Sequence, residues 1–544
     1  MGKVERITLI ALFLVPSSSF ALNNPSIEAQ AAHLFGRLAF GSRPGEVEKL
    51  QHQKIKGVHA WIEEQLHPES INDQDMERKL ASFKSLKMSP AELLATYKKP
   101  EDVALAQGIK PEDFKKNEEL KKQVRAQIGE DLLPEAIIRE QTAQRLIRDV
   151  ESRKQLQEVV IDFWLNHFNI DISKGEEKWM LPDFERSVIR KEAFNKFGDL
   201  LRATTHSAAM LYYLDNQASE SEIDYVAFEK WEKNGRKGAE PKHRNNGINE
   251  NYARELLELH TLGVDGGYSQ ADVTGLARIL TGWSIDNPKV NPVFKFKDRA
   301  HDRGEKTFLG QKFPAGLGIE EGERAIDLIL QNPATARFIC TKLARYFVAD
   351  IPPQDLIDRM VKIWHETNGD LTAIYREIFE SKEFWAKTSY AAKVKTPLQF
   401  VVSAVRAMGG ELDVKNDLPK LLATLGEEPY RCAPPTGYKD TAETWVNPGA
   451  MIGRLNFSIK VAGNRIEGVY GLLPSLRKQP RSATQLIQIV VDQLLHEPLS
   501  HASQVVVLRQ FEGQTWSMAE GEVRPINLTR ATALILGSPE FQRR

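Results

Sequence analysis

Cysteine is scarce in this sequence, which has 544 residues and only two cysteines, Cys340 and Cys432. This excludes the disulfide-dense secreted scaffolds, and no Cys-x-x-Cys pair is present for a zinc site or for haem attachment. Cys340 lies at helical spacing with Ala336, Leu343 and Phe347, which is typical of a core stripe. We therefore expect a buried free thiol there rather than a disulfide to Cys432.

Net charge and long hydrophobic runs are also lacking. The 73 basic side chains balance 74 acidic ones, so the strongly basic composition typical of nucleic-acid binding is absent and we expect no nucleic-acid partner. No segment is apolar over the roughly 20 residues that a transmembrane helix needs. A Gly-rich phosphate loop and a Gly-x-Ser-x-Gly motif are absent too. The 41% of hydrophobic residues nevertheless suffices for a large folded core.

The first 21 residues have the features of a secretory signal peptide. Lys3 and Arg6 give a basic start, Ile7–Val15 is a short apolar run, and Ser19 and Ala21 have the small-x-small spacing of a cleavage site. We predict cleavage after Ala21 and a periplasmic or secreted mature protein.

Helical periodicity dominates the rest of the chain. Apolar residues recur at three- and four-residue spacing in segments 27–66, 136–170, 184–214, 249–263, 270–283, 321–349, 354–366, 370–385, 393–409 and 483–512. This predicts an all-α, predominantly helical fold, built as a large multi-helix array. Strand signal is limited to Val293–Lys297, which we expect to form a small β-hairpin near 293–310 with the turn around Phe308–Gly310.

Composition suggests a main helical domain at 22–390 and a C-terminal helical subdomain at 391–544. Within the first, residues 77–131 are dense in lysine and glutamate and predict an insertion of solvated helices. Residues 217–248 are rich in polar and glycine residues and predict a long polar loop.

The segment 249–263 contains the most side chains that could take part in catalysis or binding. It predicts a helix with His260 on the buried face and Glu250, Arg254 and Glu255 on polar faces. These charged residues either line a cleft or form a solvated face with ion pairs, and the ion-paired face is favoured on this stretch alone.

Two further motifs contain histidine. His167 closes the predicted helix that contains Phe163–Phe168, where an inward histidine is more often a core residue than a ligand. His301 and Asp302 follow the predicted strand in a loop. They offer two metal ligands or a base with its orienting partner, or else form a turn in which Asp302 caps the backbone before Gly304.

Several strings taken together resemble one family. They are Ala32-His33-Leu34 through Gly41 with Pro44-Gly45-Glu46, Phe163 through Phe168, Asn249 through Gly263, Leu280-Thr281-Gly282-Trp283, His301-Asp302 with Lys306 through Gly310, and Pro333 through Phe338. Over nearly the whole mature chain the sequence resembles the large exported bacterial family catalogued as domain of unknown function 1800. Two departures are the insertion at 77–131, which is longer than the family pattern, and Tyr438, where the family commonly has Trp.

The resemblance implies a predominantly helical exported protein. Such proteins are often encoded beside an exported family that resembles sulfatases and phosphatases, which suggests work on an envelope or extracellular polymer. The motif positions that it carries over are Asn166, His167, Asn249, Glu250, Arg254, Glu255, His301, Asp302 and Lys306. It implies no particular cofactor, and whether a metal is bound stays open.

Two hypotheses for function follow. In the first, the protein is a hydrolase-like enzyme in which the motifs converge in one cleft. Its catalytic candidates are Glu250, Arg254, Glu255, His301 and Asp302, and its substrate-binding candidates are Asn166, His167, Asn249 and Lys306. Glu255 or His301 would be the general base, and Arg254 would stabilise charge. In the second, the same residues form a polar network in a non-catalytic scaffold or binding partner of a co-exported protein.

Overall fold

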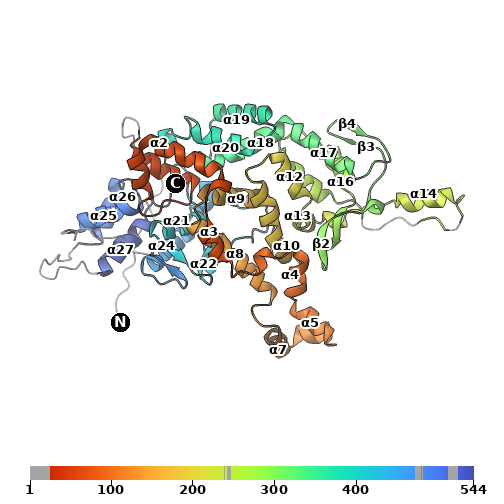
Figure 1. Ribbon diagram of the computed structural model, residues 1–544, viewed down its shortest axis with the longest axis horizontal. Coiled ribbons are helices and arrows are strands. Elements are labelled where there is room, and N and C mark those ends of the chain that lie inside the picture. The colour runs from red at the N-terminus through yellow and green to blue at the C-terminus, as the bar shows by residue number, and fades with distance from the viewer. Residues whose placement is uncertain (1–24, 238, 242–246, 472–479, 481, 513–524) are drawn as a thin grey trace.

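The computed structural model describes residues 25–237, 239–241, 247–471, 480, 482–512 and 525–544 (Figure 1). The predicted signal peptide at 1–21 lies outside the described residues. Among the helices within them, none combines the length and apolar character needed to cross a membrane.

Helices dominate, which confirms the predicted fold class. The N-terminal part contains α1 Ile27–Leu38, α2 Glu46–Leu66, α3 Gln74–Leu80, α4 Pro90–Thr96, α5 Pro100–Ala106, α6 Pro111–Lys116, α7 Glu118–Ile128, α8 Pro134–Glu151 and α9 Gln155–His167. The start of α4 follows directly from its sequence. Ser89 and Glu92 form a reciprocal capping box, and Pro90 takes the first helical position, where its missing N–H costs nothing.

The central part contains α10 Glu177–Asp183, a π-helix Phe184–Ile189, α11 Arg190–Glu192, α12 Phe197–Thr205, α13 Ala208–Tyr213, α14 Tyr225–Lys233, α15 Glu250–Glu258, α16 Gln270–Ile279, α17 Glu320–Gln331, α18 Pro333–Phe347, α19 Gln354–Thr367 and α20 Leu371–Glu380. Asn332 caps α18 by accepting from the backbone N–H of Ala334. The predicted core stripe of α18 is fully buried, and both Cys340 and Cys432 are buried free thiols, as expected.

The C-terminal part contains α21 Pro397–Ala407, α22 Leu418–Leu425, α23 Ala442–Trp445, α24 Pro448–Ala462, α25 Ala483–Leu494, α26 His501–Arg509 and α27 Pro525–Leu536. Figure 1 shows the blue helices α24 to α27 on the same side of the molecule as the red helix α2. One hydrophobic cluster runs from Leu34 of α1 through α9 and α18 to Phe541. The residues on either side of the predicted boundary at 390 therefore share a core, and that boundary stays a prediction.

Strands in the described residues form three small antiparallel pairs. These are β1 Trp283–Asn287 with β2 Asn291–Phe296, β3 Lys306–Phe308 with β4 Gln311–Phe313, and β5 Glu411–Leu412 with β6 Val469–Tyr470. The predicted strand lies in β2, but its predicted partner was wrong, because β2 pairs with β1 and the turn after Phe308 closes a separate hairpin. Helix α16 ends at Ile279, before the predicted end at 283, and β1 begins directly after Gly282, which has a φ of +80°.

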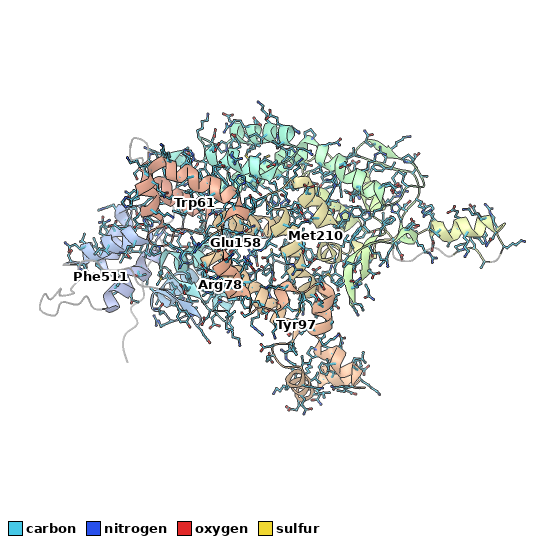
Figure 2. The ribbon with its side chains drawn as sticks, viewed as in Figure 1. Trp61, Arg78, Tyr97, Glu158, Met210 and Phe511 are labelled. Atoms are coloured by element: carbon cyan, nitrogen blue, oxygen red, sulfur yellow. The ribbon has the colours of Figure 1, made fainter. Side chains whose placement is uncertain are left out.

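Two segments project from the body of the molecule. Helices α5 and α7 of the predicted insertion extend beyond Tyr97, which Figure 2 labels near their base. Together with α6 they enclose a small separate cluster of Ala104, Phe114 and Val124. The predicted polar loop at 217–248 contains α14, so it is not purely a loop where the structure describes it; Asp224 caps this helix, which buries none of its residues.

Candidate active site

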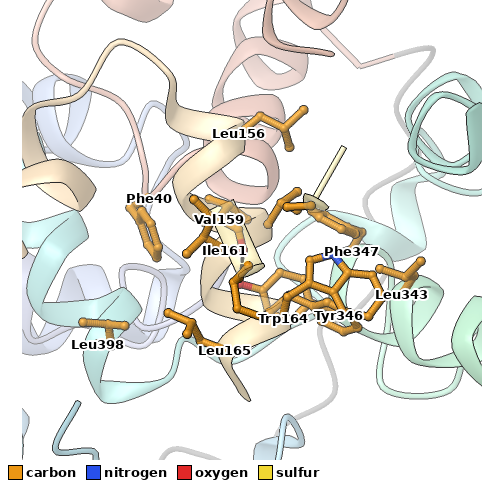
Figure 3. Close-up of a cluster of buried hydrophobic side chains, with 14 of the residues drawn as sticks. Phe40, Leu156, Val159, Ile161, Trp164, Leu165, Leu343, Tyr346, Phe347 and Leu398 are labelled. Carbon is orange, nitrogen blue, oxygen red and sulfur yellow. Dashed lines mark hydrogen bonds between the residues drawn. The ribbon is translucent and has the colours of Figure 1, made fainter. Parts of the chain in front are cut away.

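A cavity of about 400 Å³ lies between α9, α18 and the segment 427–443. Its polar and charged wall consists of Arg145, Asp162, Asn166, His167, Asn169, Lys342, Arg345, Tyr346, Thr396, Glu427, Tyr430, Thr436, Tyr438, Lys439, Asp440, Thr441 and Glu443. Figure 3 shows the apolar packing beside it, where Trp164 and Leu165 of α9 lie with Tyr346 and Phe347 of α18. Its size is in the range of small-molecule binding sites.

His167 is fixed in one orientation by two hydrogen bonds. Its side chain is buried, its Nε2 lies 3.1 Å from the backbone oxygen of His260, and Nζ of Lys342 lies 2.8 Å from its Nδ1. A carbonyl oxygen can only accept, so Nε2 carries the proton and Nδ1 accepts from the lysine. Burial and the neighbouring Lys342 hold the pKa of His167 well below its ordinary value. The imidazole is therefore neutral and serves as a fixed acceptor for Lys342.

Lys342 titrates near neutral pH. Burial, followed by the positive charge of Arg345, lowers the pKa of Lys342 to about 8. Within the part of the chain that the structure describes, no carboxylate lies within ion-pair distance of Lys342. Its ammonium group thus has a histidine nitrogen as partner and retains further N–H donors at the cavity wall.

Glu427 also titrates near neutral pH. Its side chain is buried, and the backbone N–H of Leu398 donates to its Oε2 at 2.7 Å. Burial and the negative charge of Asp162 raise the pKa of Glu427 to about 7. The cavity therefore combines a carboxyl group and an amine whose pKa values both lie close to physiological pH.

The charge of Asp162 is held in place by its own partners. Arg145 forms an ion pair with Asp162, and the hydroxyl of Tyr346 donates to Oδ2 of Asp162 at 3.0 Å. These contacts hold the Asp162 carboxylate in the position from which it raises the pKa of Glu427.

Asn166 anchors the part of the cavity wall that contains Tyr438. Its Nδ2 donates to the backbone oxygen of Tyr438 at 2.8 Å, and its Oδ1 accepts from the backbone N–H of Tyr438 at 2.7 Å. The preceding Gly437 has a φ of +69°, and a Cβ there would lie 2.3 Å from the backbone oxygen of Asn166. The predicted substrate-binding residue Asn166 thus positions the segment that contains Tyr438.

The predicted residues on α15 form an exposed network instead. Oε1 of Glu250 accepts from Thr274 at 2.7 Å and Oε2 accepts from Gln270 at 2.8 Å. Arg254 lies 3.6 Å from Glu250, at helical i,i+4 spacing. The hydrogen bond from Thr274 is the main cause of the lowered pKa of Glu250. These contacts join α15 to α16 at the surface.

Asn249 and Glu255 take different places on the same helix. Asn249 caps α15 by accepting from the backbone N–H of Asn251 at 2.8 Å, and it also donates to the backbone oxygen of Leu214 at 2.9 Å. Glu255 is partly buried, and burial followed by the charge of Glu258 raises its pKa.

His301 and Lys306 belong to a fully buried group centred on Glu321. Nζ of Lys306 lies 2.7 Å from Oε2 of Glu321, and Nε2 of His301 lies 3.3 Å from the same oxygen. His301 Nδ1 also donates to the backbone oxygen of Thr281 at 2.8 Å. These contacts attach the loop and β3 to α17.

Asp302 bonds to a different set of partners. Its Oδ2 accepts from Nε of Arg278 at 2.7 Å, and its Oδ1 accepts from the backbone N–H of Gly304 at 2.8 Å. The second contact is the turn geometry that the sequence offered as one of its two interpretations.

Of the nine predicted site residues, only Asn166 and His167 line the 400 Å³ cavity. The hydrogen bonds and ion pairs found among the described residues do not connect the side chains of Glu255 and His301 with each other or with His167. A catalytic role for the residues of α15 and the 301–306 loop stays a prediction. Within the described chain, no three or more His, Cys, Asp or Glu residues are grouped so that they could hold a metal ion.

Sequence reasoning missed Lys342 and Glu427. Lys342 gave one weak signal, because it lies three residues after Ile339 and four before Tyr346, at the edge of an apolar stripe. Glu427 precedes an irregular segment and gave no periodic signal. Its burial depends on Leu398, which is distant in sequence.

Comparison with known proteins supports the resemblance seen in the sequence. Neither the curated proteins nor the solved structures contain a match to this chain. One family model matches residues 33–543, nearly its whole length. The chain therefore belongs to the family described as Protein of unknown function (DUF1800).

Proposed function

We propose that this protein is an exported hydrolytic enzyme that acts on a polymer of the cell envelope or the extracellular space. The observation that carries this proposal is that Glu427 and Lys342 line the same cavity, with pKa values shifted to about 7 and about 8. Two groups whose environments move their pKa values towards neutrality are typical of acid–base catalysis.

The reactive form has Glu427 ionised and Lys342 protonated. The carboxylate is then the general base and the ammonium group is the general acid. Glu427 takes a proton from water, and the water oxygen bonds to the scissile centre. As the bond to the leaving group breaks, Lys342 gives its proton to the leaving atom. One water is consumed, and solvent restores both protonation states.

The other cavity residues fit binding of a polar substrate. His167 holds Lys342 in place, and the hydroxyl groups of Thr436 and Thr441 line the wall. The predicted signal peptide supports action outside the cytoplasm.

The test uses the mature protein and soluble fragments of envelope polymers, both glycans and peptides. We expect release of new reducing ends, amino groups or acids from one of these substrates. Glu427→Gln should reduce the rate at least about 100-fold, as expected for loss of a general base. Glu428→Gln is the matched control, because that neighbouring side chain is exposed and pairs with Arg431. Equal rates for Glu427→Gln and wild type would contradict the assignment.

A second candidate function is that of a non-catalytic scaffold or partner of a co-exported protein. The observation that favours it is the pair of projecting segments, α5–α7 and α14 (Figure 1). Deletion of 100–128 would then abolish partner binding. The enzyme hypothesis predicts cleavage that Glu427→Gln abolishes, whereas a pure scaffold shows none.

A further inference from the structure

A second cavity, of about 100 Å³, lies where the two ends of the described chain meet. It is enclosed by α1, α21, the end of α25 and residues 540–544. Its polar wall consists of His33, Ser42, Tyr390, Lys395, Ser403, His496, Glu497, Glu540, Arg543 and Arg544. This set shares no residue with the wall of the candidate active site.

Four buried polar atoms on residues of this wall have no hydrogen-bond partner. They are Nδ1 of His33, the hydroxyl of Tyr390, Oε2 of Glu540 and Nε of Arg544. Buried polar groups are rarely left unpaired, because each costs free energy that a hydrogen bond would offset. Nε of Arg544 and the Tyr390 hydroxyl can donate, whereas Oε2 of Glu540 accepts. Nδ1 of His33 also accepts, because Nε2 of His33 donates to the backbone oxygen of Phe384. A polar molecule that both accepts and donates would complete the site.

Lys395 shows what charge that molecule carries. The side chain is 8% exposed, and its Nζ lies 3.9 Å from the centre of the Phe541 ring. In the described chain no carboxylate reaches ion-pair distance of this ammonium group. Burial, together with the positive charges of Arg544 and Arg454, lowers the pKa of Lys395 to about 7. A buried ammonium group with two cationic neighbours lacks a counter-ion.

The carboxyl groups of the wall do not cancel this positive charge. Burial raises the pKa of Glu497, which favours its neutral form. Oε1 of Glu540 already accepts from the backbone N–H of Ser500 at 3.1 Å. The basic side chains of the wall, Lys395, Arg543 and Arg544, thus outnumber its two carboxyl side chains, Glu497 and Glu540.

We propose that this cavity binds a small oxyanion, a phosphate or a carboxylate group, with Lys395 and Arg544 as its cationic partners. The hydroxyl of Tyr390 supplies a further donor. Where the ligand carries a hydroxyl, as hydrogen phosphate does, Oε2 of Glu540 or Nδ1 of His33 accepts from it. The bound anion joins α1 to residues 540–544 and so stabilises the contact between the two ends of the described chain.

The site also lies next to the candidate active site. The guanidinium group of Arg544 donates to the backbone oxygen of Tyr346 at 3.1 Å and lies over the ring of Tyr346. Tyr346 is a wall residue of the larger cavity. Arg544 therefore links the wall of the small cavity to the wall of the larger one.

The test measures the melting temperature of the full mature protein against rising inorganic phosphate, and separately against rising acetate, with sodium chloride holding the ionic strength constant. We expect the wild type to gain stability with at least one anion, and the responding anion identifies the preferred group. Lys395→Met should lose this gain. Lys362→Met, at an exposed position on α19, and Lys342→Met, in the other cavity, should keep it.

No gain with either anion, or an equal gain in Lys395→Met, overturns the proposal. So does loss of the gain in Lys342→Met with retention in Lys395→Met, because the anion then occupies the larger cavity. If Lys395→Met fails to fold, isothermal titration calorimetry of the wild type and of Tyr390→Phe replaces it. One site per chain, with at least severalfold weaker binding in Tyr390→Phe, is expected. No binding, or equal binding in both proteins, overturns the proposal.

Discussion

Lys342 of α18 donates a 2.8 Å hydrogen bond to Nδ1 of His167 at the end of α9. The opposite ring nitrogen of His167 donates to the backbone oxygen of His260. This bond fixes the ring so that Nδ1 is the acceptor that faces Lys342. This contact joins a family-motif residue to a lysine that the motifs did not include. It places a titrating amine at the wall of the 400 Å³ cavity that Asn166 and His167 also line.

The first prediction is that Lys342→Met stabilises the protein at pH 7 while it abolishes activity. The folded pKa of about 8 lies below the ordinary 10.5. Below pH 8 Lys342 is protonated in both states, and its charge lowers the free energy of unfolding by the full amount. This destabilisation disappears as the pH rises from 8 to 10.5. Because Lys342 is only partly buried, we expect a gain of about 1–3 kcal/mol in the free energy of unfolding.

Denaturant unfolding at pH 7 and pH 10 measures this effect, with Lys362→Met as the exposed control. A loss of stability in Lys342→Met at pH 7, with activity retained, would show that Lys342 is a structural residue. Competitive acetylation of the wild type, followed by mass spectrometry, gives the pKa of Lys342 independently.

The second prediction concerns Glu427 and pH. Its folded pKa of about 7 lies above the ordinary 4.5, so the unfolded chain ionises first as the pH rises. Glu427 therefore causes stability to fall between pH 4.5 and 7, by about 3 kcal/mol in total. Glu427→Gln should remove this fall and be more stable than the wild type at pH 8. Parallel stability–pH curves for the two proteins would count against the raised pKa.

The third prediction separates buried from exposed motif residues. Glu321→Ala leaves Lys306 buried without its partner, so we expect a loss of about 3–5 kcal/mol in the free energy of unfolding. Glu250→Ala removes an exposed network and should cost about 0–1 kcal/mol. Urea unfolding measures both. Similar losses for the two variants would show that the Glu321 group is not the stronger structural element.

The fourth prediction tests the wall that Asn166 anchors. Asn166→Ala removes both hydrogen bonds to the backbone of Tyr438, and we expect a loss of about 1–3 kcal/mol in stability. The substrate KM should rise more than kcat falls, because Tyr438 lines the cavity without taking part in proton transfer. Asn195→Ala, whose amide bonds are local, is the control. An unchanged KM would place the substrate elsewhere.

Local sequence patterns predicted the helices and strands well, but they predicted poorly which distant elements contact each other. The capping box at Ser89 and the cap at Asn332 fixed two helix starts, because the atoms involved lie within three residues of each other. Strand β1, which pairs with β2, follows a turn at Gly282. The spacing of apolar residues does not predict the left-handed conformation of this glycine.

The candidate site was predicted only in part for the same reason. Asn166 and His167 belong to a recognisable motif, but their partners Tyr438 and Lys342 lie more than 170 residues away in sequence. The motif on α15 is rich in charge because it forms a surface network with α16. The motif around His301 depends on Glu321, whose burial appears only once α17 packs against β3. Clusters of charged residues in the sequence thus predicted structural hydrogen-bond networks as readily as a functional site.

A fifth prediction concerns export. We expect the mature protein to begin at Leu22, because Ser19 and Ala21 are the small residues at the right distance from the apolar run. Terminal sequencing of the protein recovered from the periplasm or the medium measures this. Recovery of a chain that begins at Met1 would contradict it.

The pH dependence of kcat/KM for polymer cleavage, measured from pH 5 to 10, tests the central claim most directly. With Glu427 as base and Lys342 as acid, the profile should be bell-shaped, with apparent pKa values of about 7 and about 8. Glu427→Gln should abolish the rate across the range, while Glu428→Gln should retain the wild-type curve. A wild-type profile that is flat between pH 6 and 9, or one that Glu427→Gln leaves unchanged, would contradict this account of the cavity.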